Sequence, residues 1–443
     1  MKAKSAPGIA LGLFLAALAV QAAALAAAPP EKDLQGRILA DRNLRLALAK
    51  AKETLRGGFN AGTGYPEVWI RDLNTFLELS LEVNGPQPIR EALLMFFKFQ
   101  APDGNVPDGY VPLDKGDSGY FFRLSPLAPG FKAHKNTVET DQETSLIQAV
   151  RKFVDLSGER GFLEAEVGPK KVWQRLRAAL LYLTRYRWSE AHGLIWGATT
   201  TDWGDVQPEH PWGVEIDEAT HRSVDIYDNA MLAIALRDYL DLVRDRPEEV
   251  SAWTPRLRDL KANVRRRLWD PQRRKFIPHL YLDGSPFPPS FREDEIYYHG
   301  GTAVAIEAGL LEPEEAREAY GRMAENVRKS GAESIGLTMY PPYPAGFFLN
   351  PSMAKPYSYI NGGDWTWFGA RMVRALIHLG FHDEAYRALK PMADRVVRDG
   401  GYFEWYTRDH KPQGSGLFKG AAGTLGIAIK ELLSWAGKPG GRP

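Results

Sequence analysis

The chain has 443 residues, 44% of them hydrophobic, so it can bury a large core as one folded unit. Its 56 basic and 55 acidic residues leave a formal charge of +1, which offers nothing to a polyanion, and we expect no nucleic-acid partner. There is no cysteine, so the protein folds without disulfides and has no cysteine-rich zinc site. No HExxH-like spacing occurs either, and we expect no bound metal.

Residues 1–28 have the pattern of a secretory signal peptide. Lys2 and Lys4 form a basic start, residues 8–24 an apolar run, and residues 24–26 a small-x-small cleavage motif. We therefore expect residues 29–443 to form a single mature domain that is secreted or periplasmic and has no membrane contact after cleavage. An uncleaved membrane anchor is the alternative, because the apolar run is nearly long enough to span a bilayer.

Apolar residues recur at helical spacing through most of the chain, which predicts an all-α protein of about twelve helices. Thr140 to Glu143 has the pattern of a capping box, and residues 311–315 place a proline and acidic residues in a first turn. The predicted helices are roughly 36–56, 71–83, 86–99, 139–156, 168–187, 223–243, 249–268, 299–309, 312–329, 362–379, 382–397 and 418–436.

From the second predicted helix onward, short and long connections alternate. Short connections produce antiparallel helix hairpins, so in an up-and-down array every long connection falls on one face. Six such hairpins closed into a ring are an (α/α)6 barrel with a funnel of long loops at one end, and compact domains rarely keep loops of this length without a use. The long connections are roughly 57–70, 100–138, 188–222, 269–298, 330–360 and 398–417.

Polar and aromatic residues gather in the long connections, mostly just before the even-numbered helices. Aromatic rings stack on the apolar faces of sugars, and the chain has 12 Trp and 18 Tyr, so these clusters suggest a carbohydrate pocket. The candidate sugar-binding residues are Trp69, Arg71, Asp72, Asp141, Trp203, Asp228, Asn229, His299, Asn361, Asp364, Trp365 and Trp405.

Each cluster also has a purely structural interpretation. Asp72, Asp141 and Asp364 are equally typical of acids in the first turn of a helix. Glu143 suits a capping-box partner better than a catalyst, and His299 is more typical of a structural histidine. What favours function is that the clusters fall on one predicted face.

Cleavage of a glycosidic bond needs one carboxylic acid that protonates the leaving oxygen and a second carboxylate that activates water or attacks the sugar. The acid needs a raised pKa, which an aromatic and partly desolvated setting provides. Asp202 and Asp205 flank Trp203 in the third long connection, and Glu404 lies in an aromatic stretch of the sixth. These three are the candidate catalytic residues.

Over most of residues 60–435 the pattern resembles the six-hairpin glycosidases, especially neutral and alkaline invertases, trehalases and processing α-glucosidase I. Residues 359–363 are similar to the invertase Asn-Gly-Gly segment, Glu404-Trp405-Tyr406 resembles the site of the catalytic base, and residues 69–72 resemble an early Arg-Asp motif whose aspartate binds sugar hydroxyls. The resemblance implies an exo-acting, inverting hydrolase that releases glucose without a cofactor. Thr201 to Asp205 departs from the family's pattern, because it offers two aspartates where the family usually has one. By resemblance, Asp202 is favoured as the acid, with Asp205 close behind.

Three other functions stay open at this point. An inverting phosphorylase on the same barrel would need converging cationic side chains for phosphate. A polysaccharide lyase would need a Tyr or His base and a cation, for which Tyr298, His299 and Arg71 are available. A non-catalytic sugar-binding protein would bind the sugar without turnover.

Overall fold

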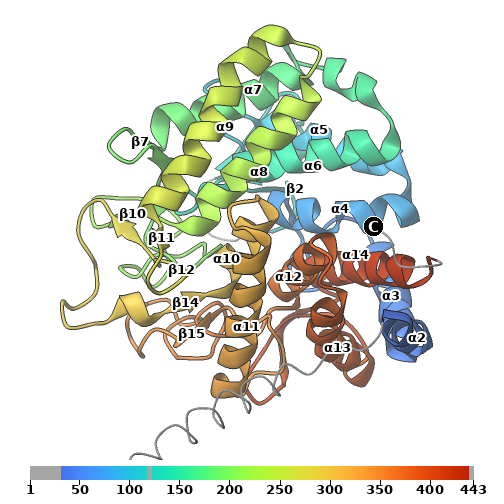
Figure 1. Ribbon diagram of the computed structural model, residues 1–443. Helices are drawn as coiled ribbons and strands as arrows, with labels where there is room; N and C mark the ends of the chain where they lie inside the picture. The colour runs from blue at the N-terminus through green and yellow to red at the C-terminus, as the bar shows by residue number, and fades with distance from the viewer. Residues whose placement is uncertain (1–30, 117–121, 439–443) are drawn as a thin grey trace, which may run out of the picture.

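Two concentric rings of helices surround one axis in the computed structural model, which describes residues 31–116 and 122–438. Each inner helix contacts the next, and the last returns to the first, which closes the ring. The labels of these six helices circle the centre of Figure 1. The inner helices are α4 (Ile70–Asn84), α6 (Asp141–Ser157), α8 (Ile226–Leu242), α10 (His299–Glu307), α12 (Thr366–His378) and α14 (Lys419–Ala436).

The outer helices pack against the outside of this ring and alternate with the inner helices along the chain. They are α3 (Arg42–Leu55), α5 (Pro86–Phe99), α7 (Val172–Tyr186), α9 (Pro247–Arg267), α11 (Pro313–Ser330) and α13 (His382–Arg398), and a further helix, α2 (Glu31–Ala40), leans on α14. The architecture is an (α/α)6 barrel, as the alternation of connection lengths predicts.

At two helix boundaries the structure differs from the prediction because a side-chain cap or a backbone pairing sets the start of the helix. The first predicted helix is two helices, because the Asp41 side chain accepts a hydrogen bond from Asn43 N at 3.0 Å and caps the start of α3. The helix predicted from residue 362 begins at Thr366, because Asp364 pairs in an extended conformation with Leu337 and Tyr406.

The capping box predicted at Thr140 is wrong. Thr140 makes no side-chain cap at the start of α6, and the buried Glu143 carboxylate instead accepts from Val106 N at 2.8 Å and Lys135 Nζ at 3.1 Å. The α11 start is as expected: Pro313 stands in the first turn, and Glu312 N donates to Glu315 Oε2 at 3.0 Å.

The long connections carry short strands rather than extended loops. They contain β1 (Val68–Trp69), β2 (Gly109–Pro112), β3 (Phe122–Arg123), β4 (Phe131–His134), β7 (Trp188–Ser189), β8 (Leu194–Ile195), β9 (Gly197–Ala198), β10 (Arg222–Val224), β11 (Trp269–Asp270), β12 (Lys275–Phe276), β13 (Leu280–Tyr281), β14 (Tyr297–Tyr298), β15 (Met339–Tyr340), β16 (Phe403–Tyr406) and β17 (Pro412–Gly416), and one 3-10 turn, η2 (Glu293–Glu295). At the other end, η1 (Arg160–Glu164), β5 (Glu166–Val167) and β6 (Lys170–Lys171) join α6 to α7.

Backbone hydrogen bonds link these loops, each to its neighbour, in a complete circle. The pairs β1–β2, β10–β13 and β14–β15 join the first loop to the second, the third to the fourth and the fourth to the fifth. Ala198 N donates to Val138 O at 2.8 Å, Asp364 bridges to Tyr406, and Thr63 N donates to Gly416 O at 3.0 Å, which closes the remaining three junctions. The six long loops therefore lie on one face, at the N-terminal ends of the inner helices.

The predicted signal peptide, residues 1–28, lies outside the described residues. Within the part of the chain that the structure describes, none of the helices combines the length and the low polarity that crossing a bilayer requires.

Candidate active site

A cavity of about 100 Å³ opens among the long loops where the inner helices begin. Since one water needs about 10–15 Å³ of such space, the cavity holds roughly seven to ten water-sized groups, which is close to one sugar ring. Five of the six long loops contribute to it. The described lining residues are Ala61, Tyr65, Trp69, Arg71, Asp72, Asp108, Glu139, Trp203, Asp205, Tyr359, Ile360, Trp365, Trp367, Glu404 and Phe418.

Asp205 reaches the cavity from the third long loop. Asn136 Nδ2 donates to Asp205 O at 3.1 Å, and Thr200 Oγ1 donates to the carbonyl of the next residue, Val206, at 2.7 Å, so both hydrogen bonds hold this stretch of backbone in place. Burial raises the pKa of the Asp205 carboxyl, and the Arg71 charge opposes that rise. A carboxyl with a raised pKa can keep its proton at a pH where an exposed aspartate is ionised.

Glu404 faces the same cavity from β16. Tyr65 Oη donates to its Oε1 at 2.9 Å, and Ser415 N donates to its Oε2 at 2.8 Å. Burial raises the pKa of Glu404, these two hydrogen bonds oppose the rise, and the nearby Asp205 charge adds to it. Gly414 adopts a φ of 69°, and a Cβ there would overlap the Glu404 carboxylate, so the hairpin needs glycine at this position.

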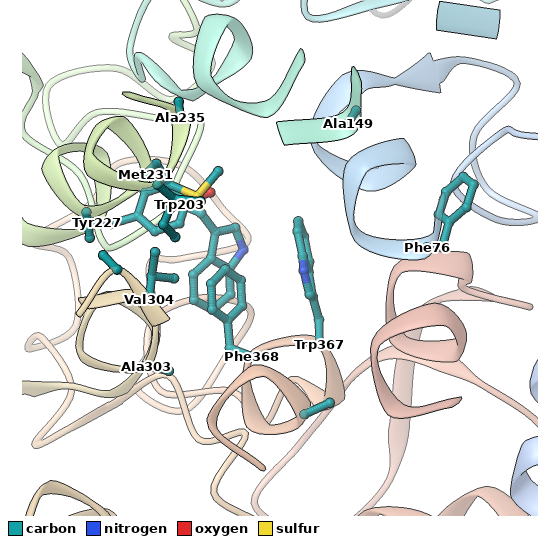
Figure 2. Close-up of a cluster of buried hydrophobic side chains, with 14 of the residues drawn as sticks. Phe76, Ala149, Trp203, Tyr227, Met231, Ala235, Ala303, Val304, Trp367 and Phe368 are labelled. Atoms are coloured by element: carbon teal, nitrogen blue, oxygen red, sulfur yellow. The ribbon is translucent and has the colours of Figure 1, made fainter. Parts of the chain in front are cut away.

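Aromatic rings form one wall of the cavity. Trp203 stacks on Phe368 with centroids 3.5 Å apart and planes 14° apart, and it meets Trp365 and Trp367 at 5.7 and 6.0 Å. Figure 2 shows Trp203 and Phe368 lying together beside Trp367 at the centre of the barrel. Because Trp203 is two residues from Asp205, this stack also fixes the loop that carries the carboxyl.

Arg71 is bound on two sides by acids. Its guanidinium pairs with Glu139, and its Nε contacts Asp141 Oδ2 at 2.6 Å, which also accepts from Tyr227 Oη at 2.7 Å. Asp141 is fully buried behind Arg71 and is not among the described lining residues. The structure thus makes Asp141 a partner of Arg71 at the cavity wall.

Two further carboxyls, Asp72 and Asp108, line the cavity without a dedicated cation. Burial raises the pKa of each to about 7, although the Arg71 charge opposes the rise in both. Asp72 follows Arg71 in the first turn of α4, and Asp108 lies just before β2 in the second long loop. Both are more than nine-tenths buried.

Three polar atoms of the lining residues have no hydrogen-bond partner within the described part of the chain. They are Asp72 Oδ1, Glu139 Oε2 and Trp367 Nε1, two acceptors and one donor. Buried polar groups in native proteins are almost always satisfied, so these atoms are suited to the hydroxyl groups of a bound ligand.

Asp202, the acid that the family resemblance favours, is placed differently from Asp205. Its two carboxylate oxygens accept hydrogen bonds from Gly300 N at 3.0 Å and Gly301 N at 2.8 Å, at the start of α10. Burial raises the pKa of Asp202 to about 7 despite these bonds. It is not among the described lining residues, so the geometry favours Asp205.

Five other candidate residues hold the loops together. Asn229 accepts from Ile195 N at 2.9 Å and donates to Ile195 O at 3.0 Å. His299 contacts Asn326 and the Ile335 carbonyl, and burial lowers its pKa to about 4. Asp228 is buried at the start of α8, where burial and the neighbouring Asp225 raise its pKa. Asn361 forms hydrogen bonds with the backbone of Tyr343 and Met353, and Asp364 pairs with Arg395 at 3.0 Å.

Trp405, half-buried on β16, packs near Tyr359 with centroids 6.4 Å apart and is not among the described lining residues. Of the predicted residues, the cavity therefore brings together Trp69, Arg71, Asp72, Trp203, Asp205, Trp365 and Glu404. The acidic and phenolic lining residues that the candidate residues omit are Tyr65, Asp108, Glu139 and Tyr359. Glu139 stands beside Asp141 in a cluster that the sequence does single out.

The described residues contain no group of three or more His, Asp or Glu side chains placed to hold a metal ion. Neither a known protein family nor a curated protein matches the sequence.

Solved structures do match it. A rhamnosidase from Klebsiella oxytoca with rhamnose bound is 16% identical with a TM-score of 0.57 over 88% of this chain, which spans 64% of the rhamnosidase. A GH63 mannosylglycerate hydrolase from Thermus thermophilus in complex with glucose is 18% identical with a TM-score of 0.59, over 86% of this chain and 99% of the hydrolase. A GH78 family rhamnosidase of Bacillus sp. GL1 is 18% identical with a TM-score of 0.57, over 87% of this chain and 34% of that one.

This chain shares their (α/α)6 barrel. At these identities the likeness concerns the fold, and the finer likeness to invertases and trehalases stays a prediction.

Proposed function

We propose that the protein is an exo-acting glycoside hydrolase that releases one terminal sugar with inversion, with Asp205 as general acid and Glu404 as general base. The observation that carries the proposal is the pairing of these two carboxyls, each with a pKa raised by burial, in one small aromatic cavity. The structural neighbours support it, because they are named as glycoside hydrolases and two of them hold rhamnose or glucose.

In this mechanism Asp205 donates its proton to the glycosidic oxygen as the bond between that oxygen and the anomeric carbon breaks. Glu404 accepts a proton from a water molecule, whose oxygen attacks the anomeric carbon from the opposite face. Inversion requires about 6.5–9.5 Å between the two carboxyls, so that the water fits. A gap of about 5 Å would instead make Glu404 a nucleophile in a retaining reaction.

The size of the cavity favours attack on a chain end. It holds about one sugar unit, and the unpartnered atoms of Asp72, Glu139 and Trp367 are available to its hydroxyls. Glucose as that sugar and export through the predicted signal peptide are parts of the same proposal.

The cationic side chains that the alternatives need are scarce here. Among the described lining residues Arg71 alone is positively charged, and it is already paired with Glu139 and Asp141. It is poorly suited to phosphate in a phosphorylase or to a uronate in a lyase. Tyr298 and His299, the bases considered for a lyase, are not among the described lining residues.

Substitutions test the assignment. Glu404→Gln and Asp205→Asn should each lower kcat/KM on an unactivated glycoside by on the order of 10²–10⁴. On an aryl glycoside with a good leaving group, Asp205→Asn should recover much of its activity, because that leaving group needs little protonation, whereas Glu404→Gln should not. Proton NMR of the first-formed sugar should show the anomer opposite to that of the substrate.

Asp202→Asn is the matched control. It should show no selective recovery on the activated substrate, and it should lower the free energy of unfolding by about 1–3 kcal/mol, because one of the two glycine amides loses its acceptor. Wild-type turnover by Glu404→Gln would overturn the proposal, and recovery by Asp202→Asn instead of Asp205→Asn would move the acid to Asp202.

A further inference from the structure

The charges around the cavity do not balance. Five of its described lining residues are acids, and only Arg71 is basic. The acids are Asp72, Asp108, Glu139, Asp205 and Glu404. The hydrolytic mechanism uses Asp205 and Glu404, which leaves three acids whose role at the site is not catalytic.

Arg71 is not available to neutralise the remaining acids. Its guanidinium is paired with Glu139 and with the buried Asp141, and both pairs lie at the edge of the cavity. Asp72 and Asp108 feel the Arg71 charge, yet burial still raises the pKa of both carboxyls to about 7. At about pH 7 each of these carboxyls is therefore ionised in roughly half of the molecules, and its charged form has no cation of its own among the described lining residues.

At least one of these carboxyls also has a free acceptor position. Asp72 Oδ1 is buried and has no hydrogen-bond partner in the described residues, and Asp72 is itself only 8% exposed. An acceptor in this position can take a hydrogen bond from a hydroxyl or from an ammonium group of a ligand. The ammonium would also supply the missing positive charge.

We propose that the terminal-sugar cavity selects by charge: it binds a sugar unit with a protonated amine more tightly than the neutral sugar, and it excludes a unit with a carboxylate, sulfate or phosphate. The inference rests on the proposed function in one respect, that the cavity receives the terminal sugar. It concerns only that unit, and the leaving group beyond the cavity is free to carry other charges.

General magnitudes set the expected size of the effect. A hydrogen bond with a charged donor is roughly twice as strong as one between neutral groups. An ammonium in place of a hydroxyl should therefore strengthen binding roughly tenfold, which corresponds to about 1.4 kcal/mol. A carboxylate brought beside Asp72 and Asp108 meets like charge wherever these acids are ionised. Because both are about half ionised at pH 7, protonating them to admit the ligand should weaken binding roughly fourfold.

Equilibrium binding of sugars to the full chain tests the inference. Trp69, Trp203, Trp365 and Trp367 line the cavity, so tryptophan fluorescence should report its occupation. At about pH 7, where most of an amine is protonated, we would titrate glucose and mannose, glucosamine and mannosamine, and glucuronate and mannuronate. In the series that binds, the amino sugar should have a roughly tenfold lower Kd than the neutral sugar, and the uronate a roughly fourfold higher Kd.

Asp108→Asn separates charge from shape. It should remove most of the advantage of the amino sugar, measured as the ratio of the neutral-sugar Kd to the amino-sugar Kd in the variant against the same ratio in the wild type. Asp114→Asn, an exposed position in the same loop, is the control and should keep the wild-type pattern. Should Asp108→Asn fail to fold, the wild-type titrations decide alone.

The possible failures are distinct. A uronate that binds as tightly as the neutral sugar, or an amino sugar that binds no tighter, overturns the charge selection and leaves the proposed hydrolase standing. If none of the six sugars binds although the wild type hydrolyses a glycoside, this inference fails alone. If the chain neither binds nor hydrolyses any of its sugars or glycosides, the proposed function fails with it.

Discussion

At the scale of single residues, Tyr65 connects the first long loop to the proposed base. Its hydroxyl donates to Glu404, and the backbone on either side is fixed, since Asn60 Nδ2 donates to Tyr65 O at 2.9 Å and Gly64 N donates to Ser415 Oγ at 2.9 Å. Ser415 N in turn holds the other oxygen of Glu404. Both oxygens of the base thus have a donor that favours the ionised form, which partly offsets its burial.

Tyr65→Phe should therefore change the pH dependence of the reaction. Without the phenolic donor the pKa of Glu404 rises further, and the base is protonated at a higher pH. The acidic limb of the kcat/KM profile should move to higher pH. The variant should therefore lose more activity on this limb than at a pH well above it. The measurement is a full pH profile of the variant against the wild type.

The control for that experiment is Tyr186→Phe, on an exposed position of α7, which should leave the profile unchanged. A Tyr65→Phe enzyme that loses activity equally at every pH would show that Tyr65 acts only through the shape of the loop. An unchanged acidic limb together with an inactive Glu404→Gln would mean that the hydrogen bond does not tune the base.

The sequence identifies the carboxyls of the site better than their supports. Glu404 and Asp205 stand among aromatic residues, a pattern visible along the chain. Tyr65 is 339 residues from its partner Glu404, and nothing in the local sequence indicates that contact. Asp108 falls in a Pro-Asp-Gly segment that is typical of an exposed turn, yet it is buried. Asp202 and Asp205 cannot be told apart by spacing, because the choice depends on the amides of Gly300 and Gly301 in another loop.

At the scale of elements, the helices were predictable because their apolar spacing is strong, while their ends depend on contacts that are distant in sequence. The inner ring adds a constraint that the hydrophobic pattern does not show: α14 approaches α4 very closely. A Cβ on Gly423 would overlap the backbone of Phe76, so glycine is needed for this contact. By contrast, a Cβ on Gly321 in α11 would meet nothing within 4 Å.

The same substitution should therefore have opposite effects at these two positions. Gly423→Ala should force α14 away from α4 and lower the free energy of unfolding by about 1–3 kcal/mol or more. Gly321→Ala should raise it by about 0.5–1 kcal/mol, because alanine loses less backbone entropy in a helix. Denaturant unfolding of both variants beside the wild type checks the pair.

Equal effects of the two alanines would contradict this account of the ring. If Gly423→Ala is as stable as the wild type, the close approach of α4 and α14 is not a constraint on the sequence.

At the scale of the whole molecule, the closed ring followed from the alternation of connection lengths, but the circle of strand pairs that ties the six loops together did not. Two-residue strands such as β1 and β14 are too short to leave a periodic pattern, and their partners belong to neighbouring loops far along the chain. This circle matters for the site, because Asp205 and Glu404 come from loops three positions apart in the ring and keep their places through it.

Buried acids also belong to this scale, since they set how stability depends on pH. Burial raises the pKa of Asp72, Asp108, Asp202 and Asp225 from an ordinary value near 4 to about 7. Between these values the folded protein binds more protons than the unfolded chain, so the free energy of unfolding falls as pH rises, by about 1.4 kcal/mol per pH unit for each group. His299 has the opposite effect, because burial lowers its pKa to about 4. Between about pH 4 and 6.5 the unfolded chain binds one more proton at this histidine than the folded protein does, so the free energy of unfolding rises with pH there.

The protein should accordingly be most stable in mildly acidic solution. Between about pH 5 and 6.5 the four acids outweigh the one histidine by at least three groups, since Asp228 and Asp238 shift in the same direction. For a chain of this size, three groups correspond to a fall in Tm of roughly 5 °C per pH unit. Toward lower pH, Glu307 and Glu431 limit the gain in stability. Burial alone would raise their pKa values, but Arg371 holds the pKa of Glu307 at about 2, and His378 with Arg374 does the same for Glu431. The stability that these two carboxylates contribute is therefore lost as pH falls below about 4. Calorimetry across pH 3–8 should show this maximum, and Asp108→Asn should make the decline above it shallower by one group. A Tm that stays level or rises from pH 5 to 6.5 would mean that these carboxyls are ionised in the folded protein, and that the cavity is wetter than its burial indicates.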